Sequence, residues 1–253
     1  MNYFFTITSN FLSCKLTVPK FQNRGQYNKK QKIFSIKISN SKFLAKQEDC
    51  HQDENFFYIN KSINQENLIY FLSNEDLNNK YLETLNLKND FLSTLPAYRC
   101  NLRIQNLSGA FSSYQSEYPG RMVDKKGSIL SQISSLFNND KSSKNILIFQ
   151  NIYFEPKKIP FKVYILDILE KKILLEKEFY TNTLNFWDIN SEYINENNFF
   201  YTSDYLGIPI YYNEKDKMIS LEHTHPLQTY ILSENKYKII RELKENVQKI
   251  VNR

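Results

Sequence analysis

The chain has 253 residues, of which 41% are hydrophobic and 24% are charged, and its formal net charge is +6. These values are ordinary for a globular protein with one large domain or two small ones. No stretch approaches the roughly 18 consecutive apolar residues of a membrane-spanning helix, which excludes an integral helical membrane protein. The three cysteines, at unrelated spacings, describe no disulfide framework and favour a reducing, cytoplasmic location.

The positive charge is concentrated at the N-terminus, where nine basic residues precede Glu48, the first acidic residue. The alternation of apolar and polar residues in 31–39 predicts a half-buried strand, so residues 1–47 are expected to form a strand pair with a basic edge. Two alternatives remain for this segment. It is either an electrostatic arm for nucleic acid or anionic lipid, or a transit peptide that directs the protein to an organelle. Residues 48–253 are slightly acidic and are expected to form a single α+β domain, so nucleic-acid binding is expected only through residues 1–47.

Several elements follow in chain order. Leu77, Tyr81, Leu82 and Leu85 have helix-like spacing and predict a helix over 75–93. Residues 99–107 alternate polar and apolar for nine positions, which predicts a strand with one solvated face. A loop follows from 108 to 127, and a short helix is expected over 129–137.

From residue 144 onward the chain is predicted to be rich in strands. Short apolar segments indicate strands at 146–149, 161–168, 173–180, 182–189 and 198–203. Residues 208–212 and 218–222 flank a polar turn and predict a hairpin, and residues 233–251 predict an amphipathic helix with Ser233 as its N-cap. The expected fold is therefore α+β, with a β-rich antiparallel sheet (a sandwich or open barrel), a few helices and a C-terminal amphipathic helix. Strands that follow one another without crossover helices disfavour a parallel sheet.

Three of the six arginines lie between residues 99 and 121, in a stretch that also contains tyrosines and a glutamate. The guanidinium group suits carboxylate or phosphate, and tyrosine rings stack on sugars. This stretch therefore predicts a site for an anionic or sugar-like ligand. The alternative is an ordered loop whose arginines pair with local acids. The predicted ligand-binding residues are Arg99, Arg103, Tyr114, Glu117, Tyr118 and Arg121.

Two of the three histidines, His223 and His225, lie two residues apart beside Glu222. If the strand continues, the two imidazoles point to one face and can share a divalent metal ion with further ligands, or act in acid–base catalysis with Glu222. The alternative is a strand end whose histidines form structural hydrogen bonds.

The leading hypothesis is a protein that binds an anionic or polyhydroxylated ligand, or a protein partner, through a face combining the arginine strand, the tyrosine loop and the Glu222–His225 segment. The alternative hypothesis is a metal-assisted or acid–base enzyme centred on His223 and His225. The two differ in geometry, because an enzyme requires both histidines on one concave face within reach of a carboxylate.

Overall fold

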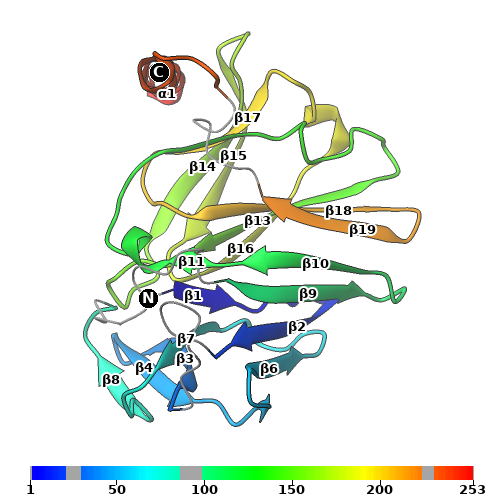
Figure 1. Cartoon of the computed structure of the whole chain (residues 1–253). Helices are drawn as coiled ribbons and strands as arrows, with labels where there is room; N and C mark the ends of the chain where they lie inside the picture. Colours follow the sequence, from blue (N-terminus) through cyan, green and yellow to red (C-terminus); the bar gives the residue numbers. More distant parts are fainter. Residues whose placement is uncertain (1, 21–29, 86–98, 224–230, 253) are drawn as a thin grey trace. The chain divides into compact units, whose positions relative to one another are not determined.

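The structure is a computed structural model that describes residues 2–20, 30–85, 99–223 and 231–252 (Figure 1). Antiparallel strands dominate it, and the described residues contain one α-helix, α1 (Lys236–Val251), at the C-terminal end of the chain. This confirms the β-rich α+β class. The chain divides into two compact units. No helix in the described ranges is both long enough and apolar enough to span a membrane.

Unit 1 comprises residues 1–124, 152–158 and 182–184 and contains two sheets. Sheet A has the strand order β11 (Tyr118–Pro119), β1 (Asn2–Phe5), β7 (Ile69–Ser73), β3 (Lys32–Ser39), β4 (Lys42–Gln47) and β8 (Lys80–Leu82). Sheet B has the order β10 (Phe111–Ser116), β9 (Cys100–Asn106), β2 (Leu12–Pro19), β6 (Phe56–Lys61) and β5 (His51–Gln52). The short 3-10 helix η2 (Gly120–Met122) follows β11.

Unit 2 comprises residues 125–151, 159–181 and 185–253. Sheet C has the order β12 (Ile129–Gln132), β17 (Asn198–Thr202), β14 (Pro160–Asp167) and β15 (Lys172–Tyr180). Sheet D has the order β16 (Thr183–Asp188), β13 (Lys144–Asn151), β18 (Ile208–Lys215) and β19 (Met218–His223). A second 3-10 helix, η3 (Ser191–Tyr193), lies between β16 and β17.

Sheets C and D pack face to face as a sandwich around aromatic rings. The ring of Phe149, on β13, lies 6.1 Å from Phe161, 5.8 Å from Phe179 and 5.5 Å from Phe200, measured between centroids, and those three rings belong to sheet C. The first pair is T-shaped and the other two are tilted, and edge-to-face arrangements of aromatic rings are favourable. The helix α1 packs its buried Val247 and Ile250 against a cluster that includes Leu130, Tyr164, Leu166, Phe199 and Tyr201 of sheet C.

Most of the strand predictions are confirmed. Strand β9 (Cys100–Asn106) lies within the alternating stretch at 99–107, and β3 (Lys32–Ser39) lies within the stretch at 31–39. The hairpin predicted at 208–222 is β18–β19, which closes through Asp216 and Lys217 at φ +50° and +65°. Two consecutive residues with positive φ are typical of tight hairpin turns, whose twist matches that of the strands. Figure 1 shows this hairpin in orange.

Two predicted helices are wrong. In the first, residues 80–82 form the edge strand β8 beside β4, and Asn79 has φ +58°, a left-handed conformation that interrupts a helix. The hydroxyl of Ser73 accepts a hydrogen bond from the amide of Glu75 in a local turn. Residues 86–93 of that helix lie outside the described residues.

The second wrong helix is the one predicted over 129–137. Residues 129–132 form β12 and pair with β17, from Ile129 opposite Thr202 to Gln132 opposite Phe199. Its apolar spacing fits a short strand followed by a turn as well as it fits a helix. Pairing with a strand distant in the sequence decides between the two, because intrinsic helix propensity is a weak preference.

Candidate functional site

Sheet B has one buried face and one exposed face. Along β9, Cys100, Leu102 and Ile104 are buried. The alternate residues Asn101, Arg103 and Gln105 are exposed. Strand β2 alternates in the same way. We call the exposed side the outer face of sheet B, and it is made by Ser13, Lys15, Thr17, His51, Tyr58, Asn60, Asn101, Arg103, Gln105, Phe111, Ser113 and Gln115.

Two cations occupy the centre of this face. Arg103 on β9 lies directly opposite Lys15 on β2, and both side chains are exposed. Like charges directly opposite each other on neighbouring strands repel and destabilise the pair. No carboxylate of the described residues forms an ion pair with either cation. The two cations therefore share one row of the sheet without a direct carboxylate partner among the described residues, although the Asp53 carboxylate accepts a hydrogen bond from the hydroxyl of Tyr58 at 2.6 Å.

Aromatic rings hold both cations over the sheet. The guanidinium carbon of Arg103 lies 3.8 Å from the ring centre of Phe111, and the Nζ atom of Lys15 lies 4.9 Å from that of Tyr58. The ring of His51 in turn stacks on Tyr58 at 5.3 Å. Cation–π contacts of this kind stabilise exposed cations by about 0.5–1 kcal/mol. They also restrict the side chains before any ligand arrives.

Uncharged hydrogen-bonding groups surround the two cations. Ser113 lies opposite Arg103, and Asn60 lies opposite Lys15, so the four side chains form one row across the sheet. Most of the remaining side chains of the face are also amides or hydroxyls. These groups both donate and accept hydrogen bonds, as the hydroxyl groups of a sugar require.

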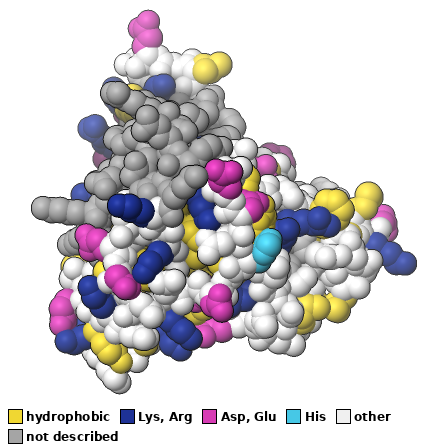
Figure 2. Space-filling model, turned by 60° about the horizontal axis from the view of Figure 1, so that its bottom comes forward, with side chains coloured by type: hydrophobic (Ala, Val, Ile, Leu, Met, Phe, Trp, Pro, Cys, Tyr) yellow, Lys and Arg dark blue, Asp and Glu magenta, His cyan; other side chains and the backbone are white. Residues whose placement is uncertain are grey.

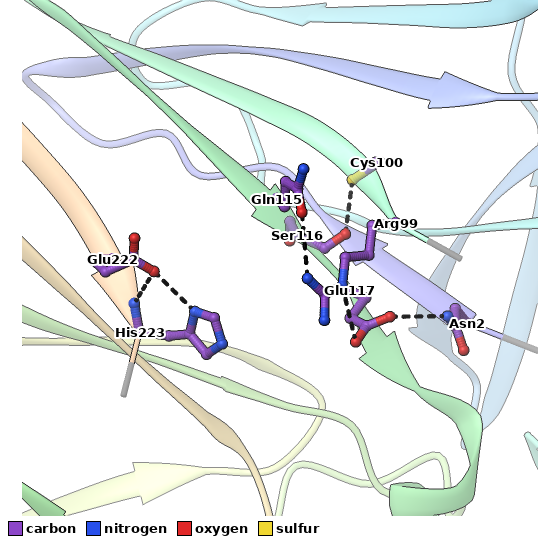
Figure 3. A network of polar contacts seen from close by, with 8 residues as sticks. All are labelled: Asn2, Arg99, Cys100, Gln115, Ser116, Glu117, Glu222 and His223. Carbon is purple, nitrogen blue, oxygen red and sulfur yellow. Dashed lines mark hydrogen bonds and ion pairs between the residues drawn. The ribbon is translucent and has the colours of Figure 1, made fainter. Parts of the chain in front are cut away.

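Arg99, just before β9, is part of a polar network at one end of this face (Figure 3). Its Nε atom lies 3.5 Å from Oε1 of Glu117, and its NH1 group donates to Oε1 of Gln115 at 3.3 Å. The amide of Asn2 donates to the other carboxylate oxygen of Glu117 at 3.3 Å. Burial raises the pKa of Glu117 above its ordinary value, and the nearby charge of Arg99 opposes that shift.

The two predicted ligand-binding tyrosines are core residues. Tyr114 is 6% exposed and Tyr118 is fully buried, and the Tyr118 hydroxyl donates a hydrogen bond to the carbonyl of Ile152 at 3.1 Å. Neither tyrosine belongs to the outer face of sheet B. Arg121, in η2, is exposed and lies close enough for its charge to lower the pKa of Glu117.

Cys100 lies on the buried side of β9. Its thiol donates to the carbonyl of Ser116 at 3.2 Å, and burial raises its pKa well above the ordinary value. A buried, protonated thiol is a poor nucleophile, so Cys100 is a packing residue.

Glu222 and His223 lie at the end of β19, in unit 2. Oε1 of Glu222 accepts a hydrogen bond from the backbone amide of His223 at 2.9 Å and contacts the Nδ1 atom of its ring at 3.0 Å (Figure 3). The carboxylate thus orients the imidazole next to it, as second-shell carboxylates do for catalytic and metal-bound histidines. His225 lies outside the described residues. Within the described residues, no group of three or more histidine, cysteine, aspartate or glutamate side chains has the arrangement of a metal site.

The basic N-terminal segment is partly neutralised by later parts of the chain. Lys32 pairs with Asp76 and Lys42 with Glu83, whereas the buried Lys20 donates to the side chain of Gln52 at 2.6 Å. On the face shown in Figure 2, the basic side chains drawn are interspersed with acidic ones and form no continuous patch. Whether residues 1–47 act as an arm or a transit peptide stays a prediction.

Sequence reasoning missed Lys15, Tyr58 and Phe111 as members of a site. The available signal was the alternation in residues 12–18, which resembles that of 99–107 and indicates a second strand with one solvated face. The pairing of these two strands, which brings Lys15 opposite Arg103, is not visible in the sequence.

The arginine stretch belongs to unit 1, and Glu222 and His223 belong to unit 2. A binding face that combines both regions therefore stays a prediction. No protein-family model, curated protein or solved structure matches this chain.

Proposed function

We propose that the protein is a binding module whose unit 1 takes an acidic saccharide on the outer face of sheet B. The observation that carries this proposal is the Lys15–Arg103 pair, two cations at directly opposite positions of neighbouring strands with no carboxylate partner among the described residues. An anionic group placed between them turns a repulsive pair into two attractive contacts. Carboxylate and sulfate groups of acidic sugars are ligands of this kind, and guanidinium binds them with two hydrogen bonds.

The composition of the face favours a saccharide over a single-stranded nucleic acid. Amides and hydroxyls outnumber the cations, and they match the many hydroxyl groups of a sugar. Single-stranded nucleic acid is usually bound by stacking its bases on aromatic rings. Here Arg103 lies over the ring of Phe111, which remains 57% exposed, and Tyr58 already contacts Lys15 and His51, so only part of the aromatic surface is free for base stacking.

The enzyme alternative rests on one contact, that of Glu222 with His223. An oriented imidazole is the starting point of acid–base or metal-assisted catalysis, but it needs further partners. The hypothesis names His225 as one of them, with a divalent metal ion as the possible cofactor. We place the enzyme alternative second. The outer face of sheet B offers several side chains that can bind one ligand together, whereas the enzyme alternative is supported by the contact of Glu222 with His223 alone.

Isothermal titration calorimetry with four probes tests the proposal. The probes are an oligogalacturonate, a sulfated oligosaccharide prepared from heparin, neutral maltohexaose and a short oligothymidylate. The proteins are the full chain and its Lys15→Gln/Arg103→Gln double variant. The matched control is Lys37→Gln, because Lys37 is also an exposed strand lysine but lies opposite the uncharged Leu44.

We expect one or both acidic saccharides to bind the wild-type protein more tightly than maltohexaose does. The double variant should lose at least about tenfold in affinity, the equivalent of about 1.4 kcal/mol, whereas the control should bind as the wild type does. If oligothymidylate binds more tightly than both acidic saccharides, the ligand of this face is a nucleic acid and not a saccharide. Equal affinities in the double variant and the wild type would overturn the proposed site.

A further inference from the structure

A polar pocket lies in unit 2, at one end of sheet D. It is formed by the segment before and at the start of β13 and by the segment at the end of β16 and in η3. Its volume is about 500 Å³, within the range of small-molecule sites in proteins. None of its lining residues belongs to the outer face of sheet B, so this pocket is independent of the function proposed above.

The floor of the pocket is fixed by hydrogen bonds. The amide of Ile189 donates to the carbonyl of Asn145 at 2.9 Å, which joins the two segments. Asn145 is 3% exposed, and its side chain bonds to the backbone of Asn138 and to the amide of Asn213. A floor held in this way keeps its shape in the absence of a ligand, which lowers the entropy lost on binding.

The two walls of the pocket carry opposite charges. Lys141 and Lys144 lie on the wall that precedes and begins β13, and Asp188 and Glu192 lie on the opposite wall. Neither carboxylate forms a hydrogen bond or an ion pair with another residue that the structure describes. The two carboxylates are therefore not held by a salt bridge across the pocket, and Lys141 supplies the positive charge on the opposite wall, whereas Lys144 already has an interaction of its own.

The lining also contains an unpartnered hydroxyl. The Oγ atom of Ser143 is buried and has no hydrogen-bond partner among the described residues. Buried polar atoms are nearly always satisfied by protein, water or ligand. Ser143 belongs to the lysine wall, and a ligand's anionic group would accept a hydrogen bond from it once the side chain turns its buried Oγ atom toward the pocket.

We propose that this pocket binds a small zwitterion, of the size of a free amino acid or a dipeptide. The anionic end of the ligand lies at Lys141 and Ser143, and the ammonium group of the ligand lies at Asp188 and Glu192. A ligand with charge of one sign is attracted by one wall and repelled by the other. A zwitterion with separated charges is attracted by both, and this difference supplies the specificity.

Two-dimensional NMR of the full chain, labelled with ¹⁵N, tests this proposal with glycylglycine as the probe. Glycinamide, which carries only the ammonium, and N-acetylglycine, which carries only the carboxylate, are the matched ligands. We expect glycylglycine to shift the amide signals of residues 141–145 and 188–192 in a saturable way. Each singly charged ligand should bind at least about tenfold more weakly.

The variant Asp188→Asn/Glu192→Gln should abolish the shifts, and Glu170→Gln, in an exposed turn of the same unit, should leave them unchanged. The Lys15→Gln/Arg103→Gln variant should also leave them unchanged, which separates this site from the one on sheet B. The proposal is overturned if glycylglycine gives no saturable shifts at these residues. It is equally overturned if all three ligands bind alike.

Discussion

Arg103 and Lys15 lie directly opposite each other on the neighbouring strands β9 and β2, each over an aromatic ring and neither paired with a carboxylate of the described residues. In a structural role, one member of such a pair would usually be acidic or neutral, because opposite charges across strands stabilise a sheet and like charges destabilise it. Two cations at these positions therefore suit an anionic ligand better than they suit a purely structural role.

The first prediction concerns this repulsion. In the Lys15→Met variant the like-charge contact is removed, so raising the salt concentration should stabilise the wild type more than the variant, because salt screens exposed charges. The expected difference is a few tenths of a kcal/mol in unfolding free energy between about 20 mM and 500 mM NaCl. Urea denaturation at the two salt concentrations measures it, with Lys37→Met as the control. An identical salt response in wild type and Lys15→Met would show that the two cations do not interact.

The second prediction concerns Asn182, which holds the segment 152–158 within unit 1. Its side chain accepts from the amide of Tyr153 at 2.8 Å and donates to the carbonyls of Glu155 and Lys157 at 2.7 and 2.9 Å, and its φ is +58°. Asn182→Gly keeps the left-handed conformation but loses all three bonds, so we expect a loss of about 2–4 kcal/mol in unfolding free energy. Asn182→Ala should lose about 1 kcal/mol more, because alanine tolerates positive φ poorly.

Chemical denaturation of both Asn182 variants checks this expectation. A glycine variant as stable as the wild type would show that the three hydrogen bonds contribute no net stability. Equal losses in the two variants would show that the backbone conformation adds nothing.

The third prediction is a pH dependence at Glu117. Burial raises the pKa of this side chain in the folded protein, so the folded state holds the proton more tightly than the unfolded state does. The resulting stabilisation is fully present below the unfolded pKa, about 4.3, and is lost as the pH rises through the folded pKa. Glu117→Gln stays neutral throughout. The stability of the variant relative to wild type should therefore increase as the pH rises from about 3 to about 7.

Thermal unfolding over this pH range measures the effect. Glu83→Gln serves as the control, because Glu83 is an exposed partner of Lys42 in the same unit. A relative stability of Glu117→Gln that stays constant with pH, or decreases as the pH rises, would contradict the raised pKa.

The fourth prediction separates the enzyme alternative from the binding module. If His223 and His225 share a metal ion, protein purified without a histidine tag should contain near-stoichiometric zinc, iron or manganese. A His223→Ala/His225→Ala variant should lose that metal. Elemental mass spectrometry of both proteins decides the question. If the wild-type protein contains no stoichiometric metal, the hypothesis of a metal-assisted enzyme is excluded. Acid–base catalysis by the Glu222–His223 pair then remains as the enzyme hypothesis.

The sequence predicts those parts of the fold that depend on local patterns. The alternation at 99–107 identified β9 and placed Arg103 on its solvated face, and the polar turn at 213–217 identified the β18–β19 hairpin. Local spacing failed where partners distant in the sequence decide the structure. Residues 80–82 are a strand because β4 offers them an edge, although their apolar spacing is that of a helix.

The same limit applies to the candidate site. The sequence does not distinguish a tyrosine that faces a ligand from a tyrosine that is buried with a partner for its hydroxyl. Tyr118 is a buried tyrosine, and its hydroxyl donates to the carbonyl of Ile152. Lys15 is one of nine basic residues that precede Glu48, and no local pattern distinguishes it from the others. Its position opposite Arg103 follows from the pairing of β2 with β9.

The central claim is that an acidic saccharide binds on the outer face of sheet B. The most direct test is to map the ¹⁵N NMR shifts of the protein during titration with oligogalacturonate and with the heparin-derived oligosaccharide. The account predicts saturable shifts concentrated in residues 12–18, 100–105 and 111–116, which disappear in the Lys15→Gln/Arg103→Gln variant. Saturable shifts located elsewhere in the chain, or shifts that persist unchanged in the variant, would contradict it.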